Sequence, residues 1–281
     1  MKTLFVPVAG SDGLEAVVAT ACLAAKHFGS LVVGSSVLPA LADYVDFSGD
    51  ASWPGGQETS WAERLQAEEL SLRATFAAAM AAFGISEEAG ATAGPCYRWQ
   101  AGPLTGDHAL SQFARLFSAT VIAHPAASKA SLSMTSFEAI LFESGRPLIL
   151  SPPNLPATLG ERILIAWNGS TETARATALA MPLLRQATRV IVLEVEGSSV
   201  PGPSARALAS ALKAEGVLAR GRTVAATELT SGQVFLMEAG ALGCDLLVKG
   251  AYTQSRLRQM FFGGATSHIL HHAKLPVLIA H

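Results

Sequence analysis

Two stretches at the starts of the two halves of this chain share one pattern. Residues 6–21 read VPVAGSDGLEAVVATA, and residues 165–180 read IAWNGSTETARATALA. Both pass from an apolar run through Gly-Ser into an Ala/Thr-rich segment. A second pair agrees, because RPLILSP at 146–152 parallels LPVLIAH at 275–281. The chain is therefore a tandem repeat with a period of roughly half its length, and each half must fold in the same way.

Within each half, short apolar runs alternate with Ala-rich segments of helical spacing, and five strands are expected in each. Such an alternation predicts an α/β fold: a parallel sheet with helices on both faces. In the first half the expected strands are Thr3–Val8, Leu31–Val37, Ala91–Trp99, Ala119–His124 and Pro147–Leu150. In the second half they are Arg162–Ala166, Arg189–Val195, Arg220–Ala226, Leu246–Lys249 and Pro276–Ile279.

A Pro-rich stretch separates the two halves. Pro152, Pro153 and Pro156 lie between the last strand of the first half and the first strand of the second. We therefore expect one domain at 1–152 and another at 161–281. Ser11 or Asp12 in the first half, and Ser170 in the second, are expected to cap the helix that follows the first strand. The segment 39–56 is expected to be a surface excursion or lid.

Composition and charge exclude several classes of protein. Half of the residues are hydrophobic and 15% are charged, which favours a folded chain with a sizeable core. The net charge of −2 offers no strong positive field for a nucleic acid, and no apolar run approaches the length of a membrane span. The three cysteines, Cys22, Cys96 and Cys244, are widely spaced, which is typical of core thiols in a reduced cytoplasm.

Glycines after the fourth strand of the second half indicate an anion site. Gly250 follows that strand, and Gly263 and Gly264 precede a helix expected at Ala265–His272. Backbone N–H groups and the dipole at such a helix start favour a phosphate. The alternative is a tight turn with close helix packing. If the first and fourth strands flank the reversal of strand order, the loop 166–170 meets the loop 250–264 there.

With these motifs the chain resembles a tandem universal stress protein over nearly its whole length. Nucleotide-binding members of that family carry Gly-x2-Gly-x9-Gly-(Ser/Thr) after the fourth strand and an Asp after the first. The resemblance implies five-stranded sheets of order 3-2-1-4-5 that pair through their last strands. In this chain the pairing would join Pro147–Leu150 to Pro276–Ile279 as an internal pseudo-dimer, with a homodimer as an alternative.

The second half follows the family motif with departures. Thr253 stands at the second glycine, Gly264 at the Ser/Thr and Asn168 at the Asp. Thr253 restricts the backbone, Asn168 keeps hydrogen-bonding ability without the charge, and Gly264 keeps its N–H. The resemblance implies a nucleotide site formed by Ala166, Trp167, Asn168, Val195, Gly250, Thr253, Gly263, Gly264 and Ala265.

The first half departs further from the motif. Ala9 stands at the Asp position, and the loop 125–133 contains no glycine. The first half is therefore interpreted as a degenerate site that is retained for folding and pairing. His268, His271 and His272 lie at helical spacing, but no carboxylate or cysteine lies close by in sequence, so no metal ligated by the protein is expected.

The leading hypothesis is a cytoplasmic stress-response protein whose second half binds an adenine nucleotide, ATP or AMP, with Mg²⁺ held through the phosphates. The nucleotide would act as a regulatory ligand for an unknown protein partner, and no catalytic residue is expected. The first alternative is an interaction or scaffold protein of the same family that does not bind nucleotide. The second is a slow ATPase, for which the sequence offers no general base.

Overall fold

The computed structural model describes residues 1–10, 12–38, 57–89, 94–124, 132–251 and 264–281, with only the helical backbone at 57–62. These residues form a 12-stranded sheet. The strands of the first half are β1 (Thr3–Val8), β2 (Leu31–Leu38), β3 (Ser86–Glu87), β4 (Cys96–Trp99), β5 (Leu104–Thr105), β6 (Ala119–Ala123) and β7 (Leu148–Ser151). Those of the second half are β8 (Arg162–Trp167), β9 (Arg189–Val195), β10 (Ala219–Val224), β11 (Leu246–Gly250) and β12 (Val277–Ala280).

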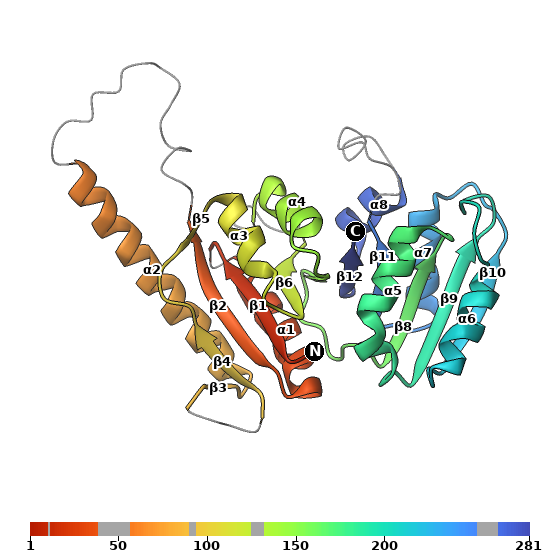
Figure 1. Cartoon of the computed structure of the whole chain (residues 1–281), viewed down its shortest axis with the longest axis horizontal. Helices are drawn as coiled ribbons and strands as arrows, with labels where there is room; N and C mark the ends of the chain where they lie inside the picture. The colour runs from red at the N-terminus through yellow and green to blue at the C-terminus, as the bar shows by residue number, and fades with distance from the viewer. Residues whose placement is uncertain (11, 39–56, 90–93, 125–131, 252–263) are drawn as a thin grey trace, which may run out of the picture.

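Both halves have the expected strand order. The sheet runs β10-β9-β8-β11-β12-β7-β6-β1-β2-β4-β3, so the five main strands of each half are ordered 3-2-1-4-5. Pairing is parallel within each half, and β12 pairs antiparallel with β7 across the middle of the molecule (Figure 1). The two expected five-stranded sheets are joined through their last strands, as expected, and the structure differs from the expectation only in the number of strands. The halves share one continuous sheet, and the two-residue strands β3 and β5 add to the first half.

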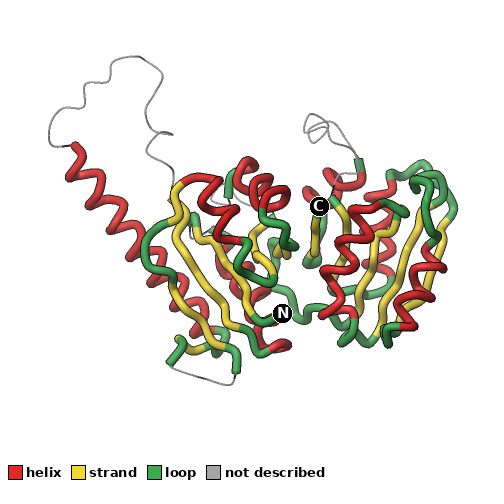
Figure 2. Tube along the Cα trace, viewed as in Figure 1, coloured by secondary structure: helices red, strands yellow, loops and turns green. Residues whose placement is uncertain are grey.

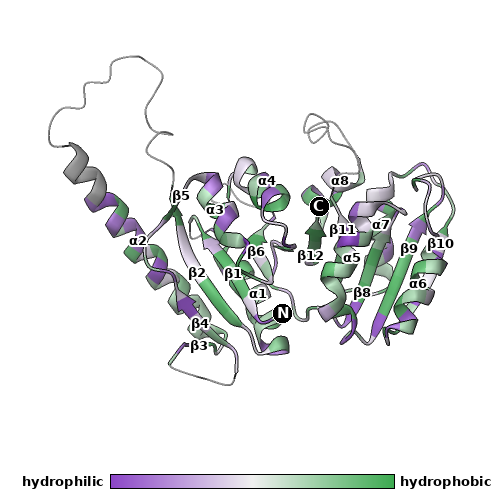
Figure 3. Ribbon diagram, viewed as in Figure 1, coloured by the Kyte–Doolittle hydropathy of each residue, from purple (hydrophilic) through white to green (hydrophobic). Residues whose placement is uncertain are grey.

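The helices cover the sheet on both faces (Figure 2). One face packs against α1 (Leu14–Phe28), α2 (Gln57–Ala82), α5 (Thr171–Leu184) and α6 (Ala205–Ala214). The other packs against α3 (Gly106–Ala114), α4 (Met134–Glu143), α7 (Ser231–Ala241) and α8 (Ala265–His272). Each face carries one apolar core that runs through both halves, and the central strands are correspondingly hydrophobic (Figure 3). Burial on both faces explains the continuous apolar runs that mark these strands in the sequence.

The two helices that follow the first strand of each half begin differently. Ser170 caps α5, and its side chain accepts a hydrogen bond from the Thr173 backbone N–H. The expected cap at Asp12 is wrong, because α1 begins after Gly13, whose φ of 73° makes the turn without a side-chain bond. The expected third strand of the first half is shorter than predicted and begins at Cys96. The expected lid at 39–56 lies outside the described residues.

Among the described residues, no helix combines the length and the apolar character needed to cross a membrane.

Candidate functional site

Sheet pairing shows which positions of the two halves correspond at the carboxyl ends of the strands. Leu4 of β1 pairs with Ala119 of β6, and Ile163 of β8 pairs with Leu246 of β11. The first and fourth strands therefore match residue by residue between the halves. In both halves these two strands are neighbours, and strands two and five lie outside them. This is the reversal of strand order at which α/β sheets bind ligands.

Asn168 follows β8 at that reversal and is half-buried. Its Oδ1 accepts hydrogen bonds from the Ser170 backbone N–H at 3.2 Å and from Thr173 Oγ1 at 2.9 Å. The side-chain oxygen therefore shapes the turn into α5. The side-chain N–H₂ group of Asn168 makes no hydrogen bond within the described residues and is left for a ligand acceptor.

The loop after β9 packs against the end of β8. Val200 donates its backbone N–H to Asn168 O at 2.9 Å, and Gly202 lies so close that a Cβ there would meet Gly169 O at 2.5 Å. Trp167 is 2% exposed, and its Nε1 donates to Pro203 O at 2.7 Å. The indole of Trp167 is thus buried in the core, which leaves only the backbone of this residue at the carboxyl end of β8. The sequence signal for this contact is the Pro-Gly-Pro at 201–203, whose role our sequence analysis missed.

Gly250 ends β11 where α5 begins. A Cβ at Gly250 would lie 2.4 Å from Thr173 N and 2.5 Å from the carbonyl carbon of Glu172. Only glycine allows the first turn of α5 to approach the strand this closely. Close helix packing, the alternative weighed from sequence, therefore accounts for Gly250 in the described residues. The same contact brings the N–H groups of α5 next to the end of β11.

Lys249 precedes Gly250 and pairs with Ala166 of β8. Its Nζ donates to Gly250 O at 3.0 Å, and the residue is 8% exposed. Burial lowers the pKa of this amine to about 8, so it is still mostly protonated at neutral pH. Within the part of the chain that the structure describes, no carboxylate pairs with it. A buried cation without a counter-ion favours an anion at the end of this strand.

The start of α8 lies against the start of α7. A Cβ at Gly232 of α7 would meet Ala265 O at 2.7 Å and the Cβ of His268 at 3.0 Å. Gly264 precedes α8 with φ 125° and ψ 164°, and among the described residues no side-chain cap is formed at the start of the helix. The uncapped N–H groups at Ala265 and the residues after it are therefore open to an acceptor.

The remaining site residues from the sequence fall into two groups. Ala166 and Val195 are buried in the core on the α7/α8 side of the sheet. Because side chains alternate along β11, Lys249 lies on the same side. Thr253 and Gly263 lie outside the described residues. The structure thus brings together Ala166, Asn168, Lys249 and Gly250 at one end of two adjacent strands.

The corresponding end of the first half is chemically different. Ala9 corresponds to Asn168 and Ile122 to Lys249, so neither the amide nor the ammonium is present. His124, one position after β6, is 3% exposed, and its Nδ1 lies 2.9 Å from Leu270 O of α8. Burial lowers the pKa of His124, against the effect of the Leu270 carbonyl, and the nearby His271 lowers it further. His124 therefore contacts the second half of the molecule.

The described residues contain no group of three or more histidine, cysteine or acidic side chains that could hold a metal ion. His268 and His272 stack with ring centroids 4.2 Å apart. The Nδ1 of His271 and that of His272 each lie within hydrogen-bond distance of the backbone oxygen four residues earlier in α8.

Residues 160–281 match the model of the universal stress protein family. The second half of this chain is a universal stress protein domain. The chain matches no curated protein sequence. Among solved structures, a universal stress protein from Archaeoglobus fulgidus DSM 4304 is 13% identical with a TM-score of 0.72, over 99% of this chain and 95% of that one. The first half therefore shares the fold of a universal stress protein.

Two further structures resemble the chain. A protein of unknown function from Pseudomonas aeruginosa PAO1 is 14% identical with a TM-score of 0.50, over 100% of this chain and 92% of that one. A universal stress protein in complex with cAMP is 18% identical with a TM-score of 0.33, over 43% of this chain and 97% of that one. At 14% identity the likeness to the Pseudomonas aeruginosa protein shows the fold alone.

Proposed function

We propose that the second universal stress protein domain binds an adenine nucleotide, ATP or AMP, as a regulatory ligand. The phosphates would lie at the end of β11, near Lys249 and the start of α8, with Mg²⁺ held through the phosphates. Asn168 would donate from its side-chain N–H₂ group to the nucleoside, and Val195 would pack against it. A bound nucleotide would alter the surface that a protein partner meets during a stress response.

Lys249 is the observation that carries this proposal. A buried ammonium without a carboxylate partner is costly, and an anionic ligand offsets that cost. It lies at the strand-order reversal, where α/β folds bind ligands. The turn at Asn168 and the uncapped start of α8 supply N–H donors, which suit phosphate and ribose oxygens.

Isothermal titration of the full chain tests the proposal, with ATP and Mg²⁺, AMP, cAMP and GTP as separate ligands. We expect saturable binding of an adenine nucleotide by the wild-type protein. Lys249→Met should weaken it at least tenfold, since it removes the charge and keeps the volume. Ile122→Met changes the corresponding position of the first half and should leave binding unchanged. Absence of heat for all four ligands would exclude the proposed function.

One observation favours the alternative of an interaction protein without nucleotide. Asn168 Oδ1 is already occupied by Ser170 and Thr173, and the loop at 200–203 packs on the same turn. Because hydrogen bonds within the protein already satisfy this side-chain oxygen, the turn needs no ligand for its stability. Co-purification of a protein partner whose binding is insensitive to added ATP would support this alternative. Slow ATP hydrolysis stays a prediction that a turnover assay can test.

A further inference from the structure

The two outer edges of the sheet are built differently. The third strand is the outermost of the five main strands of each half: β4 in the first half and β10 in the second. In the first half the short strand β3 pairs in parallel with β4 and covers that edge. In the second half, among the described residues, β10 pairs with β9 alone. The second half therefore leaves open an edge that the first half fills with a strand.

The segment that fills the first edge is acidic. Ser86 and Glu87 pair with Cys96 and Tyr97, and the Glu88 backbone N–H donates to Tyr97 O at 2.8 Å. The Glu88 carboxylate accepts a hydrogen bond from Arg98 Nε at 2.6 Å. The added strand is thus held by backbone bonds to β4 and by an ion pair with an arginine of that strand.

Sheet register places an arginine at the same position of β10. Tyr97 of β4 pairs with Val32 of β2, and Ala219 of β10 pairs with Val190 of β9. Val32 pairs with Leu4, and Val190 pairs with Ile163. Because Leu4 and Ile163 correspond, so do Tyr97 and Ala219. The next residue is Arg98 in the first half and Arg220 in the second.

The open edge begins just after Ala219, which is buried. Residues 220–223 are all exposed. The backbone N–H groups of Val190 in β9 and of Glu196 just after it donate to Leu218 O and Val224 O. The backbone groups of Gly221 and Thr223 therefore point away from β9. The side of Gly221 that would carry a Cβ packs against α6, because that Cβ would lie 2.6 Å from the Arg206 Cα. Gly221 is nevertheless exposed to solvent. Its exposed part is therefore the strand edge.

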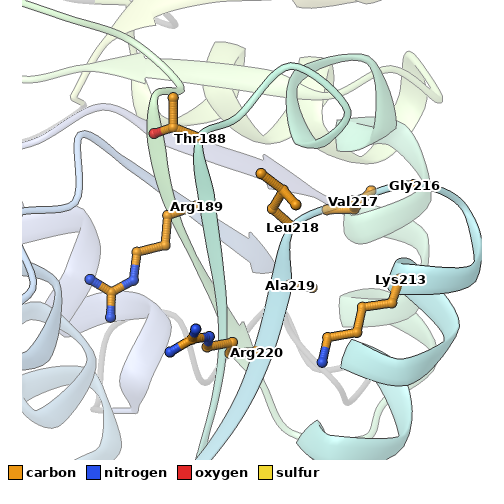
Figure 4. A pocket seen from close by; sticks show the side chains of 8 residues that line it. All are labelled: Thr188, Arg189, Lys213, Gly216, Val217, Leu218, Ala219 and Arg220. Carbon is orange, nitrogen blue, oxygen red and sulfur yellow. The ribbon is translucent and has the colours of Figure 1, made fainter.

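Cations surround the start of this edge. A cavity of about 760 Å³ is lined by Arg189, Lys213 and Arg220, with Thr188 and the turn 216–219. Figure 4 shows Arg189 and Arg220 on one side of β10 and Lys213 on the other. None of the three makes an ion pair with another described residue. Arg222, farther along the edge, forms an ion pair with Glu238, so its charge is already compensated within the protein.

We propose that β10 binds an extended acidic segment of a partner protein as an added strand, with a carboxylate of that segment on Arg220. Backbone bonds at Gly221 and Thr223 would hold the strand, whereas β3 is held on β4 at Tyr97, the counterpart of Ala219. Successive side chains of an extended peptide point to opposite faces, where they meet Arg220 on one side and Lys213 on the other. The positive edge repels β10 of a second copy, which disfavours self-association through this edge.

Binding of a labelled peptide to the full chain tests this proposal. The probe carries the sequence of residues 84–89, Gly-Ile-Ser-Glu-Glu-Ala, and its control has lysine in place of both glutamates. We expect saturable binding of the acidic peptide only. Arg220→Glu should weaken it at least tenfold and Arg220→Gln less, whereas Arg175→Glu, an equal charge change at an exposed position of α5, should have no effect.

Hydrogen exchange gives a second readout. The bound acidic peptide should slow exchange at the Gly221 and Thr223 amides, while inorganic tripolyphosphate should not. Equal loss of peptide binding in the Arg220→Glu and Arg175→Glu proteins would overturn the proposal. So would displacement of the peptide by tripolyphosphate without any amide protection, which would show instead that the cavity takes small anions.

Discussion

The carboxyl ends of the two halves carry different side chains on matching backbones. Strand order and register are the same, yet Asn168 and Lys249 of the second half correspond to Ala9 and Ile122 of the first. The fold therefore does not require the amide or the ammonium. A residue type that the fold does not require, and that is costly to bury, points to a role outside folding.

The first half uses the same end of its sheet for a different contact. His124 corresponds to Ala251 and reaches Leu270 O of α8 in the second half. In the second half, His281 stacks edge-to-face on Phe142 of α4, with ring centroids 4.7 Å apart. Each half therefore contributes a histidine to the contact between the halves, and in the first half this histidine directly follows the fourth strand.

Substitution of Gly250 should give the largest effect, on stability. Gly250→Ala places a Cβ 2.4 Å from the Thr173 backbone N, so strand and helix must separate. We expect a loss of about 3 kcal/mol in the free energy of unfolding, as for overpacked cores. Urea denaturation followed by circular dichroism measures it.

Ala123→Gly provides the matched change in the first half. Ala123 ends β6 as Gly250 ends β11, and its mutation to glycine should cost only about 0.5–1 kcal/mol through backbone entropy. Similar losses for the two substitutions would show that the loss at Gly250 arises from a general backbone effect at a strand end and not from the close approach of α5 to β11.

Removal of the Lys249 charge should separate stability from binding. Lys249→Met takes out of the core an ammonium that has no carboxylate partner among the described residues, so the free energy of unfolding should stay equal or rise by about 1 kcal/mol. Nucleotide affinity should fall at least tenfold, which corresponds to about 1.4 kcal/mol. A variant that loses binding together with several kcal/mol of stability would instead indicate a structural role for Lys249.

Sequence alone could predict the strands, because buried parallel strands leave uninterrupted apolar runs. The strand order and the pairing of the halves followed from the resemblance to the universal stress protein family. It could not predict β3 and β5, since two residues show no periodicity. Sequence left Lys249 with two interpretations, because contacts between distant segments decide whether a carboxylate pairs with it, and none does in the part of the chain that the structure describes. The correspondence of Arg98 and Arg220 could not be predicted from the sequence either, because it depends on the pairing register across the first three strands of each half.

The pH dependence of nucleotide binding should follow the ammonium of Lys249. Its pKa is about 8 in the free protein, and a bound anion should raise it, so binding takes up a proton above that pH. Affinity should be highest below pH 8 and fall by up to tenfold for each unit above it. Titrations between pH 6 and 9.5 measure this, and the Lys249→Met protein should show a flat profile over the same range.

The smallest expected effect concerns His124 and the contact between the halves. Its pKa is lowered from the usual 6.5, chiefly by burial, so the folded protein holds the ring neutral while the unfolded chain takes up a proton. Stability is therefore full above pH 6.5 and decreases as the pH falls below it, by up to about 1.4 kcal/mol per pH unit.

His124→Gln keeps a polar side chain and removes this proton uptake. The free energy of unfolding of the variant should change less between pH 6.5 and 5.5 than that of the wild type. His27→Gln, at an exposed position of α1, serves as the control and should keep the wild-type slope. If His124→Gln also kept that slope, the buried ring would have to be protonated in the folded protein. The first half would then place a charged ring, rather than a neutral N–H donor, against α8.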